Sequence, residues 1–170
     1  MKLKIIIPIL LSATIAQAQT YNFDIGASNT GWIEDTGNGN NNNSNYIAGS
    51  VGNNEYRNYF SFDLSNVLGS ITEASITINL PTGGVITSES NEIFALSSVD
   101  SVIGVNDVIS GNTALFNDLG NGGFVGSSVI TNSNGSQSVV IDLNQDFLNQ
   151  ANSSSAITLG GSVMSLNHDG

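Results

Sequence analysis

The sequence predicts an all-β protein, an antiparallel β-sandwich of the jelly-roll type, as one domain behind an export signal. Three observations lead to this prediction. Short segments of alternating apolar and polar residues recur along the chain, and a period of two is typical of strands with one buried face. Clusters of Gly and Asn separate these segments, as turns require. Helical patterning is weak and confined to two segments.

Residues 1–18 have the pattern of a secretory signal peptide. Lys2 and Lys4 make a positive start, an apolar run covers Ile5–Ile15, and Ala16-Gln17-Ala18 supplies the small residues of a cleavage site. The apolar run is shorter than the roughly 20 residues that span a bilayer. We therefore expect cleavage after Ala18, a single β-sandwich domain over residues 19–170, a secreted or cell-surface location, and no membrane insertion after signal removal.

The strands expected in the mature chain are short and evenly spread. They cover 21–26, a segment around 46–48, 60–64, 74–80, 93–96, 125–131, 139–143 and 157–159. Many short strands at this spacing favour a sandwich or jelly roll. The segment Asn38–Asn45 is nearly all Asn, Gly and Ser, so it is expected to be a mobile loop. Asn106–Leu119 and Asp146–Ala151 are expected to cross the surface of a sheet as connections, not to form a helical layer.

The charge balance excludes two classes of partner. The chain has 3 basic and 14 acidic side chains. Lys2 and Lys4 leave with the signal, so Arg57 alone remains and the mature formal charge is 1 − 14 = −13. Without a basic patch, binding to nucleic acid or to anionic lipid is not expected. The chain has no cysteine, so its stability must come from a packed core.

The residues offer little for catalysis. His168 is the only histidine, so neither a catalytic triad nor a histidine-rich zinc site can be assembled, and no catalytic residue is predicted. A glycosidase needs two carboxylates across a cleft, and Glu34-Asp35, Glu55 and Asp63 are the available acids. Their ordinary interpretation is that they are solvated or cap turns.

No cofactor is predicted, although calcium is a weak candidate. Asp35 and Asp118 lie in segments rich in the oxygen ligands that calcium prefers. Neither segment has the spacing of an EF-hand loop, and ordinary turn chemistry is the competing interpretation of both.

The candidate ligand-binding residues are Trp32, Asp35, Tyr46, Tyr56 and Arg57. Flat aromatic rings stack on sugar rings, while polar side chains bond to sugar hydroxyls. Two alternatives stay open: Trp32 belongs to the core, or Arg57 forms a structural ion pair with a nearby acid and stacks on a tyrosine. The second alternative predicts that removal of Arg57 impairs folding more than binding.

Several segments carry a family resemblance. GWIEDTG at 31–37, NYIAG at 45–49, RNYFSFDLS at 57–65, ITEASI at 71–76, LFNDLG at 115–120 and ITLGGS at 157–162 resemble uncharacterised exported bacterial proteins. Many of those proteins carry a PEP-CTERM sorting segment, which this chain lacks. They also usually continue into a final strand beyond the position that corresponds to Gly170 of this chain. The resemblance therefore implies a sandwich without its last strand, with an exposed sheet edge.

The strand FSFDLS followed by ITEASI is more distantly similar to the DNRLRE-type jelly roll. Some domains of that type act as carbohydrate-binding modules, so the resemblance implies a jelly roll and favours glycan binding, but it assigns no binding residue. The leading expectation is a secreted, non-catalytic module that binds polysaccharide. One alternative is a structural surface or biofilm-matrix protein that self-associates through sheet edges. Another is a carboxylate-based enzyme that degrades polysaccharide.

Overall fold

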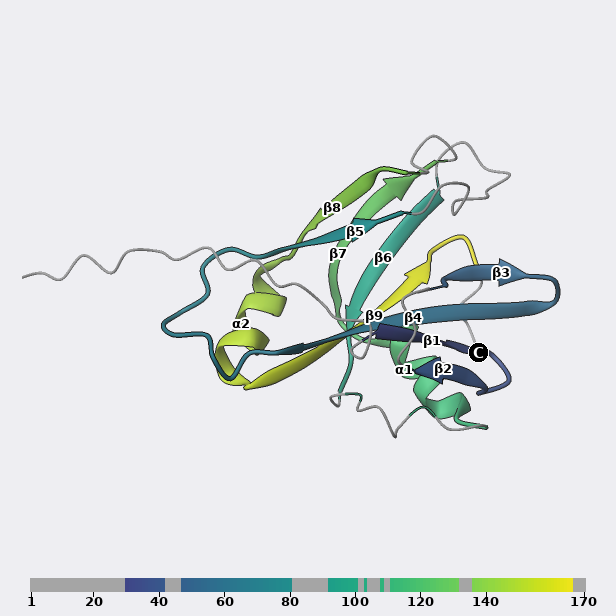
Figure 1. Cartoon of the computed structure of the whole chain (residues 1–170), viewed down its shortest axis with the longest axis horizontal. Helices are drawn as coiled ribbons and strands as arrows, with labels where there is room; N and C mark the ends of the chain where they lie inside the picture. Colours follow the sequence, from purple (N-terminus) through teal and green to yellow (C-terminus); the bar gives the residue numbers. More distant parts are fainter. Residues whose placement is uncertain are drawn as a thin grey trace, which may run out of the picture.

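The computed structural model describes residues 30–41, 47–80, 92–100, 103, 108, 111–131 and 136–166. Of these residues, 49% lie in strands and 17% in helices, and the sheets are antiparallel, so the all-β prediction is confirmed. The strands are β1 (Thr30–Glu34), β2 (Gly39–Asn41), β3 (Gly49–Val51), β4 (Asn54–Asp63), β5 (Ser75–Asn79), β6 (Glu92–Ser98), β7 (Phe124–Ile130), β8 (Ser138–Asp142) and β9 (Ala156–Val163). The helices are α1 (Thr113–Asn121) and α2 (Gln145–Ser153) (Figure 1). The signal segment, the expected strand 21–26, Tyr46 and His168 lie outside the described residues.

The described strands form two sheets that pack in a sandwich-like arrangement. The larger sheet has the order β2-β1-β4-β9-β6-β7, with β3 also paired to β4, and the smaller sheet consists of β5 and β8. In Figure 1 the β5–β8 pair stands beside β6 and β7, whereas β1, β2 and β3 gather at the other end of the larger sheet. This order does not by itself establish the jelly-roll topology.

The main core lies between the two sheets and includes one face of α2. Alternate residues of each strand point into it, as the period of two predicted. Its buried side chains are Phe60, Phe62, Leu64, Ile71, Ile76, Ile78, Phe94, Leu96, Val125, Val139, Ile141, Phe147, Leu148, Ala151, Ile157 and Leu159. The side chain of Asn144 caps α2 by accepting hydrogen bonds from the backbone N–H groups of Asp146 (3.0 Å) and Phe147 (3.1 Å).

A second core lies on the opposite face of the larger sheet, under α1. It joins Ile33 and Tyr59 of the sheet to Phe116 and Leu119 of the helix. The helix lies directly on β9 because Gly160 has no side chain, and a Cβ atom there would collide with the backbone of Leu119.

The prediction that 106–119 forms only a surface connection was therefore wrong. Two side chains of α1, Phe116 and Leu119, are buried, so this helix is a packing layer of the protein. It begins later than the apolar pattern suggested, after Gly111 with its positive φ of 85° and the N-cap Asn112. The side chain of Asn112 accepts a hydrogen bond from the backbone N–H of Leu115 at 3.1 Å, which fixes the first turn.

The prediction of a loop at 38–45 was wrong for residues 39–41. These residues form β2 and pair with β1 in the register Ile33 to Gly39, Trp32 to Asn40 and Gly31 to Asn41. Strand pairing uses backbone groups, so a polar and glycine-rich composition does not prevent a short edge strand. The strand expected around 46–48 instead begins at Gly49, the first residue of β3.

The last described strand is central in the larger sheet. β9 pairs with β4 on one side and with β6 on the other, and within the described residues β2 and β7 lie at the two ends of the strand order. The absence of a closing strand stays a prediction. In the described part of the chain, no helix is long and apolar enough to cross a membrane.

Candidate functional site

The alternation of β4 sends Tyr56 and Arg57 to opposite faces of the larger sheet. Tyr56 shares the face of Phe60, which belongs to the core between the sheets, because residues four apart in a strand point the same way. Glu34 and Trp32 of β1 lie on that same face, since Glu34 pairs with Tyr56 and Trp32 pairs with Asn58. Arg57 pairs with Ile33, whose side chain packs in the core under α1.

Trp32 and Tyr56 form an aromatic pair at the β1–β4 end of the sheet. Their ring centroids are 5.2 Å apart and the planes meet at 69°, an edge-on arrangement. Both residues are half-buried, so Trp32 does not belong to either buried core. Its indole Nε1 is buried and has no hydrogen-bond acceptor among the described residues. Buried donors in folded proteins are usually paired, so this indole N–H is a candidate for contact with a ligand.

The carboxylate of Glu34 organises the polar side chains around this pair. Its Oε1 accepts hydrogen bonds from the Thr36 hydroxyl (2.6 Å) and the Asn38 amide (2.9 Å), and its Oε2 accepts one from the Asn54 amide (3.0 Å). These bonds, and a further one from the Tyr56 hydroxyl, lower the pKa of Glu34 from 4.5 to about 2. The carboxyl group is therefore ionised at neutral pH and holds no proton to donate. We call this set the sheet-end cluster; it comprises Trp32, Glu34, Thr36, Asn38, Asn54 and Tyr56.

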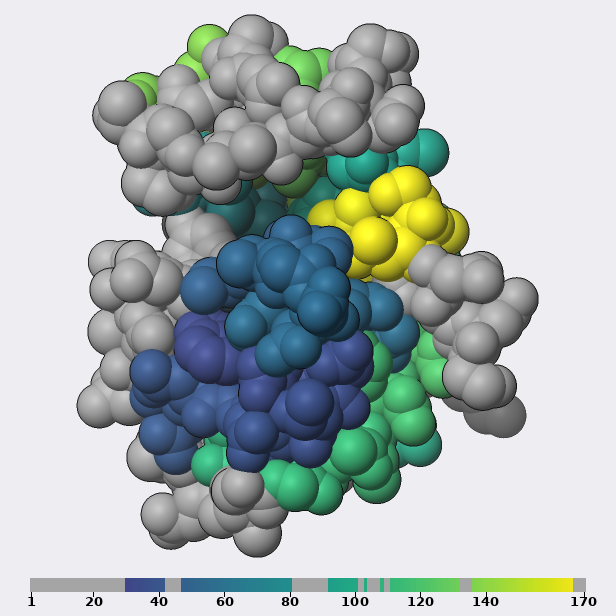
Figure 2. All heavy atoms as spheres, turned by 90° about the vertical axis from the view of Figure 1, so that its right-hand side faces the viewer, coloured from purple at the N-terminus to yellow at the C-terminus, as the bar shows by residue number. Residues whose placement is uncertain are grey.

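Asp35 lies in the turn beside this cluster. Its side chain is exposed, while its backbone N–H donates to the Glu55 carbonyl at 2.9 Å. The turn is closed by a hydrogen bond of 2.8 Å from the Gly37 N–H to the Glu34 carbonyl, with Gly37 at a φ of 82°. Burial raises the pKa of Tyr56, the hydrogen bond to Glu34 and the charge of Glu34 raise it further, and the charge of Asp35 makes the smallest contribution. Figure 2 looks at this end of the molecule, where the segments from β1 to β4 form one continuous face.

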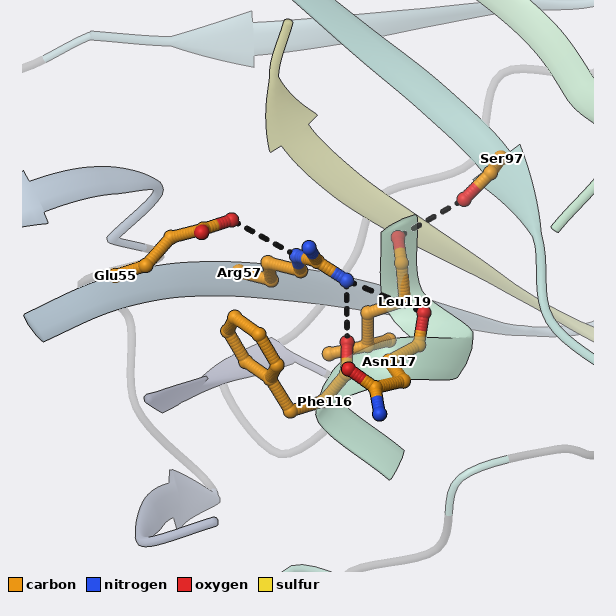
Figure 3. A network of polar contacts seen from close by, with 6 residues as sticks. All are labelled: Glu55, Arg57, Ser97, Phe116, Asn117 and Leu119. Atoms are coloured by element: carbon orange, nitrogen blue, oxygen red, sulfur yellow. Dashed lines mark hydrogen bonds and ion pairs between the residues drawn. The ribbon is translucent and has the colours of Figure 1, made fainter. Parts of the chain in front are cut away.

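The side chain of Arg57 connects β4 to α1 through hydrogen bonds, as Figure 3 shows. Its side chain is 2% exposed, and its Nε pairs with the Glu55 carboxylate at 3.0 Å. Nη1 donates to the backbone carbonyls of Phe116 (2.9 Å) and Asn117 (3.2 Å). The guanidinium also lies 4.1 Å from the centroid of the Phe116 ring. The hydrogen bonds from Nη1 are charge-assisted, because the donor is a guanidinium, and such bonds are stronger than those between neutral groups.

The structure therefore favours the structural interpretation of Arg57. The ion pair with Glu55 is present as predicted, but the ring under the guanidinium is Phe116, not a tyrosine. The sequence could not identify this ring, because α1 is remote from β4 in the chain. Arg57 is buried on the other face of the sheet and does not belong to the sheet-end cluster, so a ligand contact of Arg57 stays a prediction.

Three of the four acids considered for catalysis are held apart by the fold, whereas the fourth, Asp35, directly follows Glu34 in the turn after β1. Glu55 lies on the face opposite Glu34 and pairs with Arg57. Asp63 is at the far end of β4, about 26 Å from Glu55 at the usual rise of a strand, and it accepts a hydrogen bond from the Ser65 N–H at 2.9 Å. These three carboxylates do not share a site.

The two calcium candidates also lie in different surroundings. Asp118 is half-buried on α1, and burial together with the neighbouring charge of Asp100 raises its pKa. Asp35 belongs to the turn after β1. Among the residues that the structure places, no group of three or more Asp, Glu, His or Cys side chains could hold a metal ion.

The structure thus brings together two of the five candidate binding residues. Trp32 and Tyr56 are in contact at one end of the sheet, Asp35 is exposed in the turn after β1, Arg57 is on the other face, and Tyr46 is outside the described residues. Sequence reasoning missed the role of Glu34 and the amides of Asn38 and Asn54. The run from Glu34 to Asn38 signals a turn, but nothing in the sequence indicates that Asn54 contacts Glu34.

The fold and this cluster define the protein as an all-β antiparallel domain with an aromatic and acidic surface at one end of its larger sheet. No protein-family model matches the chain, and no curated protein matches it.

Proposed function

We propose that the protein is a secreted, non-catalytic extracellular module that binds polysaccharide through the sheet-end cluster. The observation that carries the proposal is the half-buried pair of Trp32 and Tyr56 beside the carboxylate and amides gathered by Glu34. Aromatic faces contact the apolar face of a sugar ring, while carboxylate and amide oxygens accept hydrogen bonds from its hydroxyls.

Three further features support binding without catalysis. The Glu34 carboxylate is surrounded by donors, with a pKa of about 2, so it is poorly suited to serve as a general acid at neutral pH. The carboxylates of Glu34, Glu55 and Asp63 are separated by the sheet and by the length of β4. The indole N–H of Trp32 is buried without a hydrogen-bond acceptor among the described residues. An unpaired donor of this kind supports a role for Trp32 in binding instead of in stability.

The test is a glycan array with the purified protein, repeated with calcium and with a chelator, and followed by titration of each bound glycan into variants. Trp32→Phe keeps an aromatic ring and removes the orphaned donor, so we expect unchanged or higher stability. It reduces the stacking area, so we expect weaker binding by about threefold to tenfold. Tyr56→Ala should weaken binding further. Phe124→Ala is the matched control, since Phe124 is an aromatic residue 55% exposed on β7.

Two outcomes would count against this function. One is an array with no bound glycan under either calcium condition. The other is binding that Tyr56→Ala and Phe124→Ala reduce equally, because the bound surface would then lie elsewhere.

A second candidate function is self-association through a sheet edge, as in a structural surface or biofilm-matrix protein. The strand β7, with the sequence FVGSSVI, has no charged residue and lies at one end of the described strand order. Phe124 and Val129 are 55% and 49% exposed. Edge strands are commonly protected from pairing by charges such as Lys, and β7 carries none.

Light scattering across a concentration series tests this candidate. We expect the native protein to associate at high concentration and Val129→Lys to prevent it. Val140→Lys is the control, since Val140 is 56% exposed on β8, outside the larger sheet. A protein that stays monomeric throughout would exclude self-association as the function.

A further inference from the structure

The polar side chains of the sheet-end cluster converge on the Glu34 carboxylate. The Thr36 hydroxyl donates to Oε1, and the Asn38 amino group donates to Oε1 at 2.9 Å and to the Thr36 oxygen at 3.0 Å. The Asn54 amino group donates to Oε2, and the Tyr56 hydroxyl bonds to the same carboxylate. A carboxylate can only accept hydrogen bonds, so each of these four side chains turns a donor inward, toward Glu34.

This arrangement commits donors that an anionic ligand would need. A threonine hydroxyl has one hydrogen and an asparagine amino group has two, and the bonds above use all three of Thr36 and Asn38. An anion that leaves water needs such donors or a cation in their place. Arg57 is the only Lys, Arg or His in the described part of the chain, and its guanidinium is bound to Glu55 and α1 on the opposite face.

The Glu34 carboxylate also places a negative charge beside the aromatic pair. It accepts a hydrogen bond from Tyr56, whose ring centroid is 5.2 Å from that of Trp32. The pKa of Glu34 is lowered to about 2 by its donors, so the charge is present at neutral pH. A ligand carboxylate or sulfate at the pair would meet this like charge, whereas a neutral hydroxyl avoids the repulsion and can both donate and accept hydrogen bonds.

We propose that the ligand of the sheet-end cluster is a neutral polysaccharide, and that the cluster discriminates against polysaccharides that carry carboxylates or sulfates. This inference rests on the proposed function and adds the class of glycan. The neutral sugar ring stacks on the Trp32–Tyr56 pair. Glu34 is the residue that sets this specificity, because an anionic sugar would meet its charge while the surrounding donors are already bound to it.

Pairs of oligosaccharides that differ only in charge test the inference on the purified protein. Each pair consists of a neutral hexasaccharide and the same chain with each primary alcohol oxidised to a carboxylate. The neutral members are β-1,4-glucan, β-1,3-glucan, α-1,4-glucan and β-1,4-mannan, and any other neutral glycan bound in the array is oxidised and added in the same way. We expect the oxidised form of each bound glycan to bind at least about fivefold more weakly, as for like charges about 8 Å apart near a protein surface.

Two readouts follow the titrations. Calorimetry gives the affinity of each oligosaccharide. Trp32 is the only tryptophan of the chain, so its fluorescence reports whether the bound sugar lies at the sheet-end cluster. We expect the fluorescence to change with each neutral oligosaccharide that binds.

Val51→Lys separates a local effect from general repulsion by an acidic protein. Val51 is 60% exposed and pairs with Asn54 in the β3–β4 ladder, so its side chain lies on the face of the cluster. A lysine there adds a cation and removes none of the bonds to Glu34. We expect it to strengthen binding of the oxidised oligosaccharides about twofold to fivefold and to leave the neutral ones unchanged.

Val140→Lys is the matched control, because Val140 is 56% exposed on β8 of the smaller sheet and the substitution adds the same charge. At about 0.15 M salt the Debye length is about 8 Å, so this remote lysine should leave both affinities unchanged.

Each remaining outcome overturns a defined statement. Oxidised oligosaccharides that bind as tightly as the neutral ones, or an array in which only anionic glycans bind, would overturn the inference but retain the proposed function. No gain in Val51→Lys, or an equal gain in Val140→Lys, would show that the discrimination does not arise at the cluster, and would also overturn the inference. Binding without a change in Trp32 fluorescence would overturn the proposed site, and no binding of any oligosaccharide, with an empty array, would overturn the proposed function itself.

Discussion

Replacement of Arg57 by Met should destabilise the protein strongly. The substitution keeps an unbranched apolar stem but removes the ion pair with Glu55, two hydrogen bonds to the carbonyls of α1 and the contact with the Phe116 ring. Glu55 is 18% exposed, so the ion pair contributes only about 1 kcal/mol. The buried hydrogen bonds from a charged group contribute about 1.5–3 kcal/mol, and the ring contact about 0.5–2 kcal/mol.

We therefore expect Arg57→Met to lower the free energy of unfolding by about 3–5 kcal/mol, in the range for breaking a buried charged contact. In a chain of this length that loss corresponds to a decrease in Tm of about 6–20 °C. Urea denaturation and differential scanning calorimetry measure both quantities.

Glu55→Gln is the control for Arg57→Met, because it removes the charge of the partner and keeps the contacts to α1. It should lower stability by at most about 1 kcal/mol. Arg57 would not hold α1 against β4 if Arg57→Met stayed within about 1 kcal/mol of the native protein, or if Glu55→Gln were equally damaging.

Three further predictions concern packing, acid stability and capping. Gly120→Ala should destabilise by about 1–3 kcal/mol in urea denaturation, because its Cβ would lie 2.5 Å from Nη1 of Arg57. Glu34 has a pKa lowered from 4.5 to about 2, so its stabilisation is complete above pH 4.5 and is lost as the pH falls through about 2. The stability difference between the native protein and Glu34→Gln should therefore shrink over that interval; a constant difference would contradict the lowered pKa. Asn144→Ala should cost about 1–2 kcal/mol in thermal unfolding, since Asn144 caps α2 and donates to the Phe124 carbonyl at 2.8 Å.

Strands with a clear alternating pattern were predictable from the sequence. Five of the expected segments, from 74–80 to 157–159, overlap β5 to β9, although β6 and β9 extend beyond the segments expected for them. The segment 60–64 predicted only the second half of β4, which begins at Asn54. In its central part β4 is buried on both faces, because the second core covers one side, and the period of two cannot be seen where both faces are covered.

Elements without an apolar pattern of their own, and contacts remote in sequence, were not predictable. The residues of β2 are Gly39, Asn40 and Asn41, and this strand is held by backbone pairing with the neighbouring strand β1. Likewise, the structural ion pair of Arg57 was predictable, but its contacts with the carbonyls of α1 and with the Phe116 ring were not, because the sequence does not show that α1 lies beside β4. The sheet-end cluster was partly predictable from its aromatic residues, but the contact between Glu34 and Asn54 joins residues 20 positions apart.

We infer that the sheet-end cluster is the glycan-binding surface. Backbone amide chemical shifts of the isotope-labelled protein should be followed while an oligosaccharide of a glycan that binds in the array is titrated in. We predict that the largest shift changes occur at residues 31–38 and 54–58, with α2, β5 and β8 unchanged. Changes concentrated on β5, β8 or α1 instead would show that the glycan binds elsewhere.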